Sequence, residues 1–141
     1  MKKRIISICM ICCIIFMGLT TMAYAAQPEP ILPLWTNALS FDAVLSFSSN
    51  TGIVTVSILG RPGVTNIITE IRLYYRNTTG AWTEIDKDWN YNVNQMMFSV
   101  EESVAGVRGR EYKIEVDAYL TKNGVTESIS KSHIVTCPNT P

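Results

Sequence analysis

From Leu39 onward, apolar and polar residues alternate in short runs, and this alternation constrains the fold more than any other sequence feature. In residues 39–47 every odd position is apolar, and in residues 112–120 every even position is apolar. Successive side chains of a β-strand point to opposite faces, so a period of two predicts strands with one buried face. No run shows the 3.6-residue period of an amphipathic helix. The chain beyond residue 38 is therefore expected to be all-β.

Turn residues divide this region into about seven predicted strands. Between the last two, Asn123-Gly124 supplies the positive φ angles of a tight hairpin. Residues 88–95 are polar and rich in asparagine, and we interpret them as a loop. Short strands without intervening helices favour a single antiparallel two-sheet sandwich over an α/β fold, and also over a barrel. The predicted strands occupy residues 39–47, 53–59, 67–76, 81–87, 97–101, 112–121 and 125–136.

The first 25 residues have the features of a secretory signal peptide, which we expect to form a helix. Residues 2–4 are basic, residues 5–19 are apolar, and Ala23-Tyr24-Ala25 fits the small-x-small pattern of a cleavage site. The apolar run is shorter than the roughly 20 residues that cross a bilayer. We therefore expect cleavage after Ala25 and a secreted, extracellular protein with no membrane segment after cleavage.

The chain divides into four expected parts. Residues 1–25 are the signal peptide, and residues 26–38, which contain three prolines, form an extended arm. Residues 39–137 form the β-sandwich domain, and residues 138–141 form a C-terminal tail. Removing 25 residues from 141 leaves 116, a length that suits one domain with one hydrophobic core.

The charge balance argues against nucleic acid and anionic membranes as partners, and the cysteine count argues against an intrachain disulfide. The chain has 12 basic and 12 acidic residues, and loss of residues 2–4 leaves nine basic ones. This slightly acidic balance gives no electrostatic reason to bind nucleic acid or an anionic membrane. Three of the four cysteines lie in the signal segment, so Cys137 has no intrachain partner. It is expected to be a free thiol or to form an intermolecular disulfide, which would give a Cys137-linked dimer.

Residues 112–118 read Tyr-Lys-Ile-Glu-Val-Asp-Ala, and Gly124 follows in the hairpin. This segment resembles the F strand of fibronectin type III and related immunoglobulin-like domains, which has the pattern Tyr-x-apolar-x-Val-x-Ala. Gly106 and Gly109 are similar to the glycines of the corner that precedes that strand. The resemblance implies that the Tyr112 hydroxyl bonds to the backbone a few residues upstream and clamps the turn between the sheets.

Several short pieces resemble one further group of proteins. They are Pro33-Leu34-Trp35-Thr36-Asn37, Leu73-Tyr74, Gly80-Ala81-Trp82 with Trp89, Asn123-Gly124 with Glu127, Ile129 and Ser130, and Cys137-Pro138. Taken together, they make the chain similar to a family of small secreted proteins of Gram-positive bacteria without an assigned function. The resemblance implies a fold but no active residues.

No arrangement of residues predicts catalysis. The only histidine, His133, precedes Cys137 by four residues in a predicted strand. That spacing places the two about 13 Å apart, which is too far for a Cys–His dyad. We therefore interpret His133 as a surface strand histidine, and we predict no catalytic residue and no enzyme activity.

The polar segment that begins at Asp86 partly matches a calcium-binding loop. Oxygen-bearing side chains occupy alternate positions from Asp86 to Asn92, as in the first half of an EF-hand loop. However, Tyr91 replaces the glycine of the sharp turn, and Met97 replaces the glutamate that closes the shell. The sequence predicts no metal and no cofactor.

Four aromatic residues form the candidate binding surface. Tyr74 is expected on the outward face of its strand, and Trp82, Trp89 and Tyr91 fall in or beside the neighbouring edge and loop. Exposed rings could stack on sugars or anchor a protein partner. In the alternative interpretation, Trp82 or Trp89 caps the open end of the core.

Three hypotheses for function follow. The first is a secreted, non-enzymatic binding or interaction module whose partner is an extracellular protein or glycan. The second is a structural subunit that assembles through edge strands, because residues 126–136 carry few inward-pointing charges that would protect a strand edge. The third is a carbohydrate-binding module that uses the exposed aromatic residues.

Overall fold

The computed structural model describes residues 34–139, which form two antiparallel β-sheets and no helix. The predicted signal peptide and residues 26–33 of the predicted arm lie outside the described residues. The all-β prediction is confirmed, with eight strands in place of about seven. The strands are β1 (Ala38–Ser48), β2 (Thr51–Gly60), β3 (Val64–Arg76), β4 (Trp82–Ile85), β5 (Asn90–Val93), β6 (Met97–Ala105), β7 (Glu111–Lys122) and β8 (Val125–Thr136).

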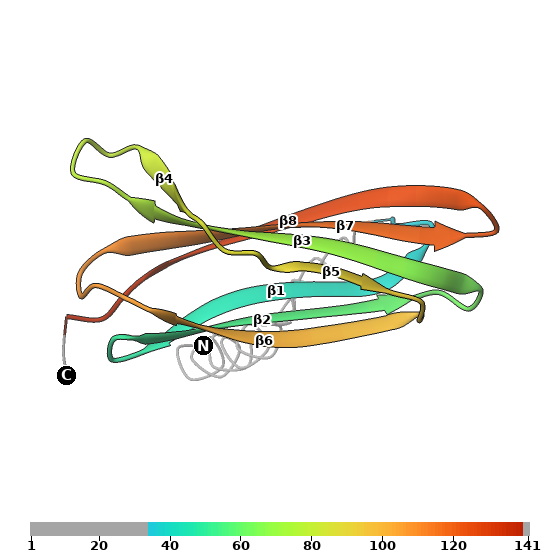
Figure 1. Ribbon diagram of the computed structural model, residues 1–141, viewed down its shortest axis with the longest axis horizontal. Coiled ribbons are helices and arrows are strands. Elements are labelled where there is room, and N and C mark those ends of the chain that lie inside the picture. The colour runs from blue at the N-terminus through green and yellow to red at the C-terminus, as the bar shows by residue number, and fades with distance from the viewer. Residues whose placement is uncertain (1–33, 140–141) are drawn as a thin grey trace, which may run out of the picture. The chain divides into compact units, whose positions relative to one another are not determined.

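The strands form two layers. One sheet has the order β1-β2-β6, and the other has the order β4-β3-β7-β8, with β5 also paired to β3. Every strand pair is antiparallel. The chain changes layer after β2, after β5 and after β6, as Figure 1 shows. This is the antiparallel two-sheet sandwich that the alternation predicted.

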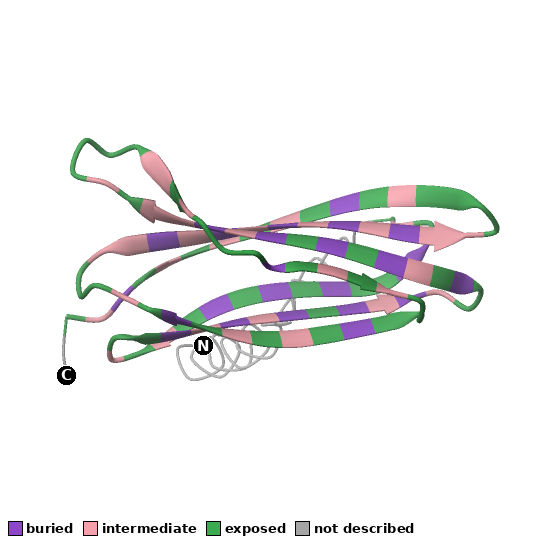
Figure 2. Ribbon diagram, viewed as in Figure 1, coloured by how far each residue is buried: buried purple, intermediate pink, exposed green. Residues whose placement is uncertain are grey.

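The core lies between the inner faces of the long strands. Along β2, β3 and β7, buried residues alternate with more exposed ones, which gives the banded ribbons of Figure 2. Each large aliphatic side chain that leaves water in this way stabilises the fold by about 1.5–3 kcal/mol. The core side chains with no measurable exposure include Val54, Val56, Ile58, Ile67, Leu73, Ile114, Val116 and Leu120.

The first strand departs from the predicted alternation at its start. A register shift between Ala38 and Ser40 in the pairing with β2 marks a β-bulge. A bulge adds one residue to one strand, so it changes which side chains face inward. Ala38 is therefore 1% exposed, whereas Leu39 is 49% exposed. The interpretation of Leu39 as an inward-facing residue is wrong.

The segment predicted as an asparagine-rich loop contains a strand. β5 pairs with residues 67–70 of β3, and Tyr91 and Val93 pack against the core. Asn90 and Asn92, which suggested a loop, are exposed. The two inward side chains and the ladder with β3 therefore outweigh the low strand propensity of asparagine.

The corner before β7 has the hydrogen bond that the fibronectin resemblance implies. The Tyr112 hydroxyl accepts a hydrogen bond from the backbone amide of Val107 at 2.8 Å, and Tyr112 is 1% exposed. A Cβ atom at Gly106 would lie 2.4 Å from the Phe47 ring and 3.0 Å from Cys137 Sγ. Only glycine fits that close approach, so Gly106 lets the corner fold over the end of the core.

The hairpin between β7 and β8 has the predicted turn. Asn123 and Gly124 have φ angles of 51° and 75°. Two consecutive positive φ angles match the right-handed twist of the flanking strands in a two-residue turn. The turn sets a continuous register from Lys122–Val125 to Glu111–Thr136.

Side chains of β8 join it to β1, the edge strand of the other sheet. His133 Nδ1 accepts a hydrogen bond from the Leu45 amide at 3.1 Å. Lys131 Nζ donates to the Phe41 carbonyl at 3.2 Å and to the Asp42 carboxylate at 2.6 Å. The hydrogen bond from Lys131 lowers the pKa of Asp42. We call this set the β1–β8 seam.

A second contact joins the sheets on the opposite side. The Tyr91 hydroxyl of β5 donates to the Glu102 carboxylate of β6 at 2.5 Å. The Tyr91 ring lies 5.2 Å from the Phe98 ring, centroid to centroid. Burial, together with the hydrogen bond to Glu102, raises the pKa of Tyr91 to about 12.

Candidate functional site

Charged and aromatic side chains gather on the outer face of the β4-β3-β7-β8 sheet. Buried residues, all apolar except Thr69, fill the inward positions of β3 and β7, so the residues between them point outward. The register places Tyr74 beside Glu84 and Lys113, and Arg72 beside Glu115. This surface, which we call the charged face, consists of Arg72, Tyr74, Arg76, Trp82, Glu84, Lys113, Glu115, Asp117, Ser130 and Ser132.

One corner of the charged face is a cluster of rings and cations. Lys113 Nζ lies 4.6 Å from the Tyr74 ring centroid and 5.0 Å from that of Trp82. The Arg76 guanidinium lies 5.6 Å from the Trp82 ring centroid. Lys113 also pairs with Glu115 at 2.7 Å, and its side chain is only 16% exposed. We call Tyr74, Trp82 and Lys113 the aromatic corner.

In the aromatic corner, Lys113 covers the faces of the Tyr74 and Trp82 rings. A cation within about 6 Å of a ring centroid is attracted by the negative face of the ring. Lys113 therefore occupies the space over both Tyr74 and Trp82. Burial, together with the negative charge of Glu115, raises the pKa of Tyr74. The two rings contact the protein's own ammonium group, so they are fixed walls rather than a bare stacking platform.

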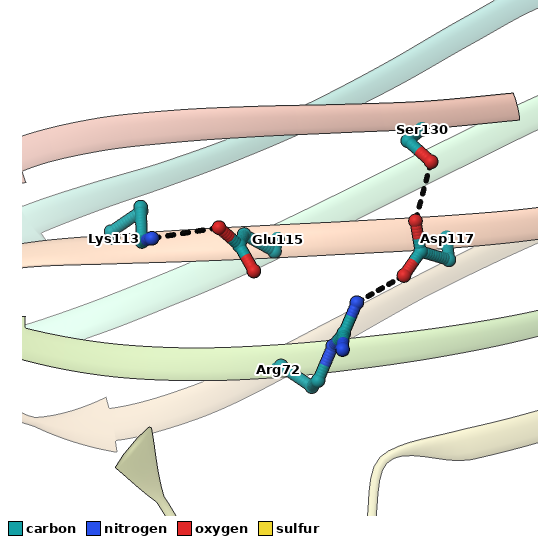
Figure 3. Close-up of polar contacts among 5 residues, drawn as sticks. All are labelled: Arg72, Lys113, Glu115, Asp117 and Ser130. Atoms are coloured by element: carbon teal, nitrogen blue, oxygen red, sulfur yellow. Dashed lines mark hydrogen bonds and ion pairs between the residues drawn. The ribbon is translucent and has the colours of Figure 1, made fainter. Parts of the chain in front are cut away.

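A shallow depression of about 240 Å³ lies beside the aromatic corner. The Arg72 Nη2 atom contacts one carboxylate oxygen of Asp117, and the Ser130 hydroxyl donates to the other (Figure 3). The three residues come from β3, β7 and β8, so adjacent strands bring them together. The lining residues are Arg72, Glu115, Asp117, Ser130, Lys131 and Ser132.

Arg72 is held in place by its surroundings. Burial by itself would lower the pKa of Arg72, but the negative charge of Asp117 raises it. The Arg72 Nε atom is buried and has no hydrogen-bond partner among the described residues.

The structure does not bring the four predicted aromatic residues together. Tyr74 and Trp82 lie side by side in the aromatic corner. Trp89 is 8% exposed and belongs to the core, so its prediction as a surface residue is wrong. Tyr91 is partly buried and bonds to Glu102 between the sheets. Only the first pair contributes to the charged face.

The side chains of His133 and Cys137 both contact the backbone of the domain itself. His133, predicted as a surface histidine, is partly buried and accepts the Leu45 amide in the β1–β8 seam. Cys137 has no measurable exposure, and its thiol contacts the Ser49 carbonyl at 3.3 Å. A Cys137-linked dimer would therefore require the C-terminal end of the domain to open.

The oxygen-rich segment considered for calcium makes contacts of its own. Asn90 Nδ2 donates to Asp88, and Asn66 Nδ2 donates to Asn92 at 2.6 Å. Across residues 34–139, no group of three or more His, Cys, Asp or Glu side chains is placed to hold a metal ion. In the same residues, no helix is long and apolar enough to cross a membrane.

Sequence reasoning missed the depression. The sequence pattern indicates no functional role for Arg72, Asp117 or Ser130. Period two shows that these side chains point outward, but it does not give the register between strands. That register places Arg72 opposite Glu115 and Asp117 opposite Ser130.

No protein-family model matches the chain, and no curated protein matches it. Among solved structures, the crystal structure of Parabacteroides merdae β-glucuronidase is similar over 67% of this chain and 13% of that chain. The sequence identity is 12% and the TM-score is 0.42. At that score the likeness carries no weight, and the fold rests on the strand order and register described above.

Proposed function

We propose that this protein is a secreted, non-enzymatic binding module with an immunoglobulin-like fold. It contacts an extracellular protein or glycan through the charged face. The observation that carries the proposal is the depression beside the aromatic corner, where ion pairs and ring contacts fix polar side chains of three adjacent strands. Because these groups are already ordered, binding costs less conformational entropy than it would on a mobile surface.

The proposal includes secretion and membership in the family of small secreted Gram-positive proteins. The basic residues 2–4, the apolar run after them and the Ala23-Tyr24-Ala25 site support secretion. The hydrogen bond between Tyr112 and Val107 supports the relation to fibronectin-like domains, because such domains use it to fix the same corner.

The contacts and burial of the potentially reactive side chains favour a binding role over catalysis. His133 accepts a backbone amide through Nδ1, and Cys137 is fully buried. Glu115 and Asp117 are each paired with a cation. A general base needs a free lone pair within reach of its substrate, and the Leu45 amide already occupies the Nδ1 lone pair of His133.

The test is capture of partners from intact cell surfaces and from a glycan array. The charged-face variant is Arg72→Ser with Trp82→Ser, since Trp89 belongs to the core and cannot serve as a surface probe. The matched control is Ser57→Arg with Ser99→Arg, which adds bulk to the outer face of the β1-β2-β6 sheet. Thermal unfolding of each variant shows whether it is folded.

We expect the charged-face variant to lose capture and the control to keep it. Loss of capture only in the control would contradict the proposal, because binding would then use the other face. Polymers that grow with protein concentration in light scattering would favour the structural-subunit alternative. The β1–β8 seam already occupies the backbone groups of Phe41 and Leu45, which leaves fewer of them free on that side for another strand.

A further inference from the structure

The size of the depression indicates an extended ligand. Its volume of about 240 Å³ is below the roughly 300–1,000 Å³ of sites that enclose a drug-sized molecule. It is also open, since it lies on the outer surface of a sheet. A ligand would therefore place one unit in the depression and continue along the charged face.

The charges around the depression are balanced. Arg72 pairs with Asp117, and Lys113 pairs with Glu115. Lys131, which also lines the depression, directs its ammonium group to Asp42 in the β1–β8 seam. An anionic ligand would compete with Asp117 for Arg72, and a cationic ligand would compete with Lys113 for Glu115. Charge complementarity therefore favours an uncharged ligand.

The depression has no excess of charge, but many hydrogen-bond donors and acceptors lie close together around it. A guanidinium has five N–H donors, and each ionised carboxylate has about four lone-pair sites. The contact between Arg72 and Asp117 and the hydrogen bond from Ser130 to Asp117 use only some of this capacity. Ser132 adds a hydroxyl that has no hydrogen-bond partner among the described side chains. A ligand that both donates and accepts through closely spaced groups would match this set.

Resting on the function proposed above, we propose that the charged face binds a neutral oligosaccharide, with one sugar unit over Arg72, Asp117 and Ser130. Sugar hydroxyls both donate and accept hydrogen bonds, and they carry no charge that would disturb the two ion pairs. Tyr74 lies two residues from Arg72 on the outer face of β3, and Lys113 covers its ring, so the two side chains bound the depression on that side. The aromatic corner thus serves as a wall, and hydrogen bonds supply the selectivity.

The experiment titrates the purified protein with soluble polysaccharides and follows backbone amide shifts by NMR and heat by calorimetry. The neutral probes are amylose, galactomannan and xyloglucan, and the charged probes are polygalacturonate and chitosan. The site variant is Ser130→Ala with Ser132→Ala, which removes two hydroxyls and no charge. Ser128→Ala is the matched control, because Ser128 is an exposed serine of the same strand that does not line the depression.

We expect at least one neutral polysaccharide to bind, with shifts confined to β3, β7 and β8. Its Kd should rise on the order of tenfold in the double variant, which corresponds to loss of about one net hydrogen bond. The control should leave the Kd unchanged, and added salt should have little effect because no ligand charge is screened.

Binding of a charged probe alone, with a steep dependence on salt, would overturn the inference. So would binding that Ser130→Ala with Ser132→Ala does not alter. If the charged-face variant loses cell-surface capture but no neutral polysaccharide binds, the inference fails and the proposed function stands. If that variant changes neither capture nor titration, both fail.

Discussion

The Glu127 carboxylate accepts a hydrogen bond from the Asn37 amide at 2.5 Å, although 90 residues separate the two. The other oxygen of Glu127 accepts the Thr36 amide at 2.7 Å. The Asn37 side chain in turn donates to the carbonyls of Leu120 at 2.9 Å and Val125 at 3.3 Å. These contacts fasten the start of β1 to the β7–β8 hairpin.

This contact joins two segments that are far apart in the sequence. Residues 33–37 end at Asn37, and Asn123-Gly124 with Glu127 forms the hairpin end. Asn37 falls in the segment interpreted as an extended arm, yet it is only 5% exposed. The two pieces therefore specify one local structure, in which a carboxylate and an amide side chain bind backbone groups of both segments.

Replacing Asn37 with alanine should destabilise the protein by about 1–3 kcal/mol. The change leaves the Leu120 carbonyl without its side-chain donor in a buried position, and it also removes the partly buried contact to the Val125 carbonyl. Urea unfolding followed by tryptophan fluorescence measures the effect. Asn90→Ala is the control, because Asn90 is exposed and contacts only the Asp88 side chain. Equal effects of the two substitutions would contradict a special role for Asn37.

Tyr112→Phe should cost about 1–3 kcal/mol, because it removes the hydroxyl that accepts the Val107 amide and leaves the ring in the core. The matched control is Tyr119→Phe. Tyr119 lies on the same strand but faces outward, and its hydroxyl has no hydrogen-bond partner among residues 34–139. Chemical denaturation compares the two. A neutral Tyr112→Phe would mean that the ring alone holds the corner.

Local sequence patterns predicted most of the fold because the long strands bury one face each. The alternation in β2, β3 and β7 matches their buried positions, and Asn123-Gly124 sets the hairpin. Such patterns depend only on the direction of neighbouring side chains. The predictions failed where a contact distant in sequence decides the structure. The bulge before Ser40 and the pairing of β5 with β3 are two such cases.

The candidate site was less predictable than the fold. The sequence identified Tyr74 and Trp82 as surface aromatics, but nothing local shows that Lys113 lies over both rings. Trp89 follows a polar segment, so its burial depends on how the chain enters β5. The depression needs the relative register of three strands, which single-sequence periodicity does not contain.

Trp89→Ala should destabilise the protein by about 3–5 kcal/mol, because it leaves a cavity in the core. Trp82→Ala should cost much less, since Trp82 is only partly buried and packs on the outer face against Arg76 and Lys113. Thermal and urea unfolding of both variants give the comparison. Similar costs would show that the aromatic corner stabilises the fold as much as the core does.

The Tyr91 hydroxyl should ionise at a higher pH than that of an ordinary tyrosine. Burial and the hydrogen bond to Glu102 raise its pKa to about 12, above the unfolded value of about 10. The neutral phenol therefore stabilises the fold fully below about pH 10, and the contribution is lost as the pH rises through about 12. Because the pKa of Tyr74 is also raised, absorbance titration should show one late phenolate fewer in Tyr91→Phe than in the control Tyr119→Phe. A late titration of unchanged amplitude in Tyr91→Phe would contradict the assignment.

The β1–β8 seam predicts which backbone amide depends on His133. The Leu45 amide points away from β2 and bonds to His133 Nδ1, whereas the neighbouring Val44 amide points toward β2. In His133→Ala, hydrogen exchange at Leu45 should accelerate by on the order of tenfold or more, because its only acceptor is gone. Exchange at Val44 should change little, and this residue is the internal control. If both amides accelerate together, the whole edge of β1 opens. If neither changes, another group protects Leu45. Selective loss at Leu45 would show that a single imidazole covers a backbone donor on a strand edge that would otherwise be free to pair with another chain.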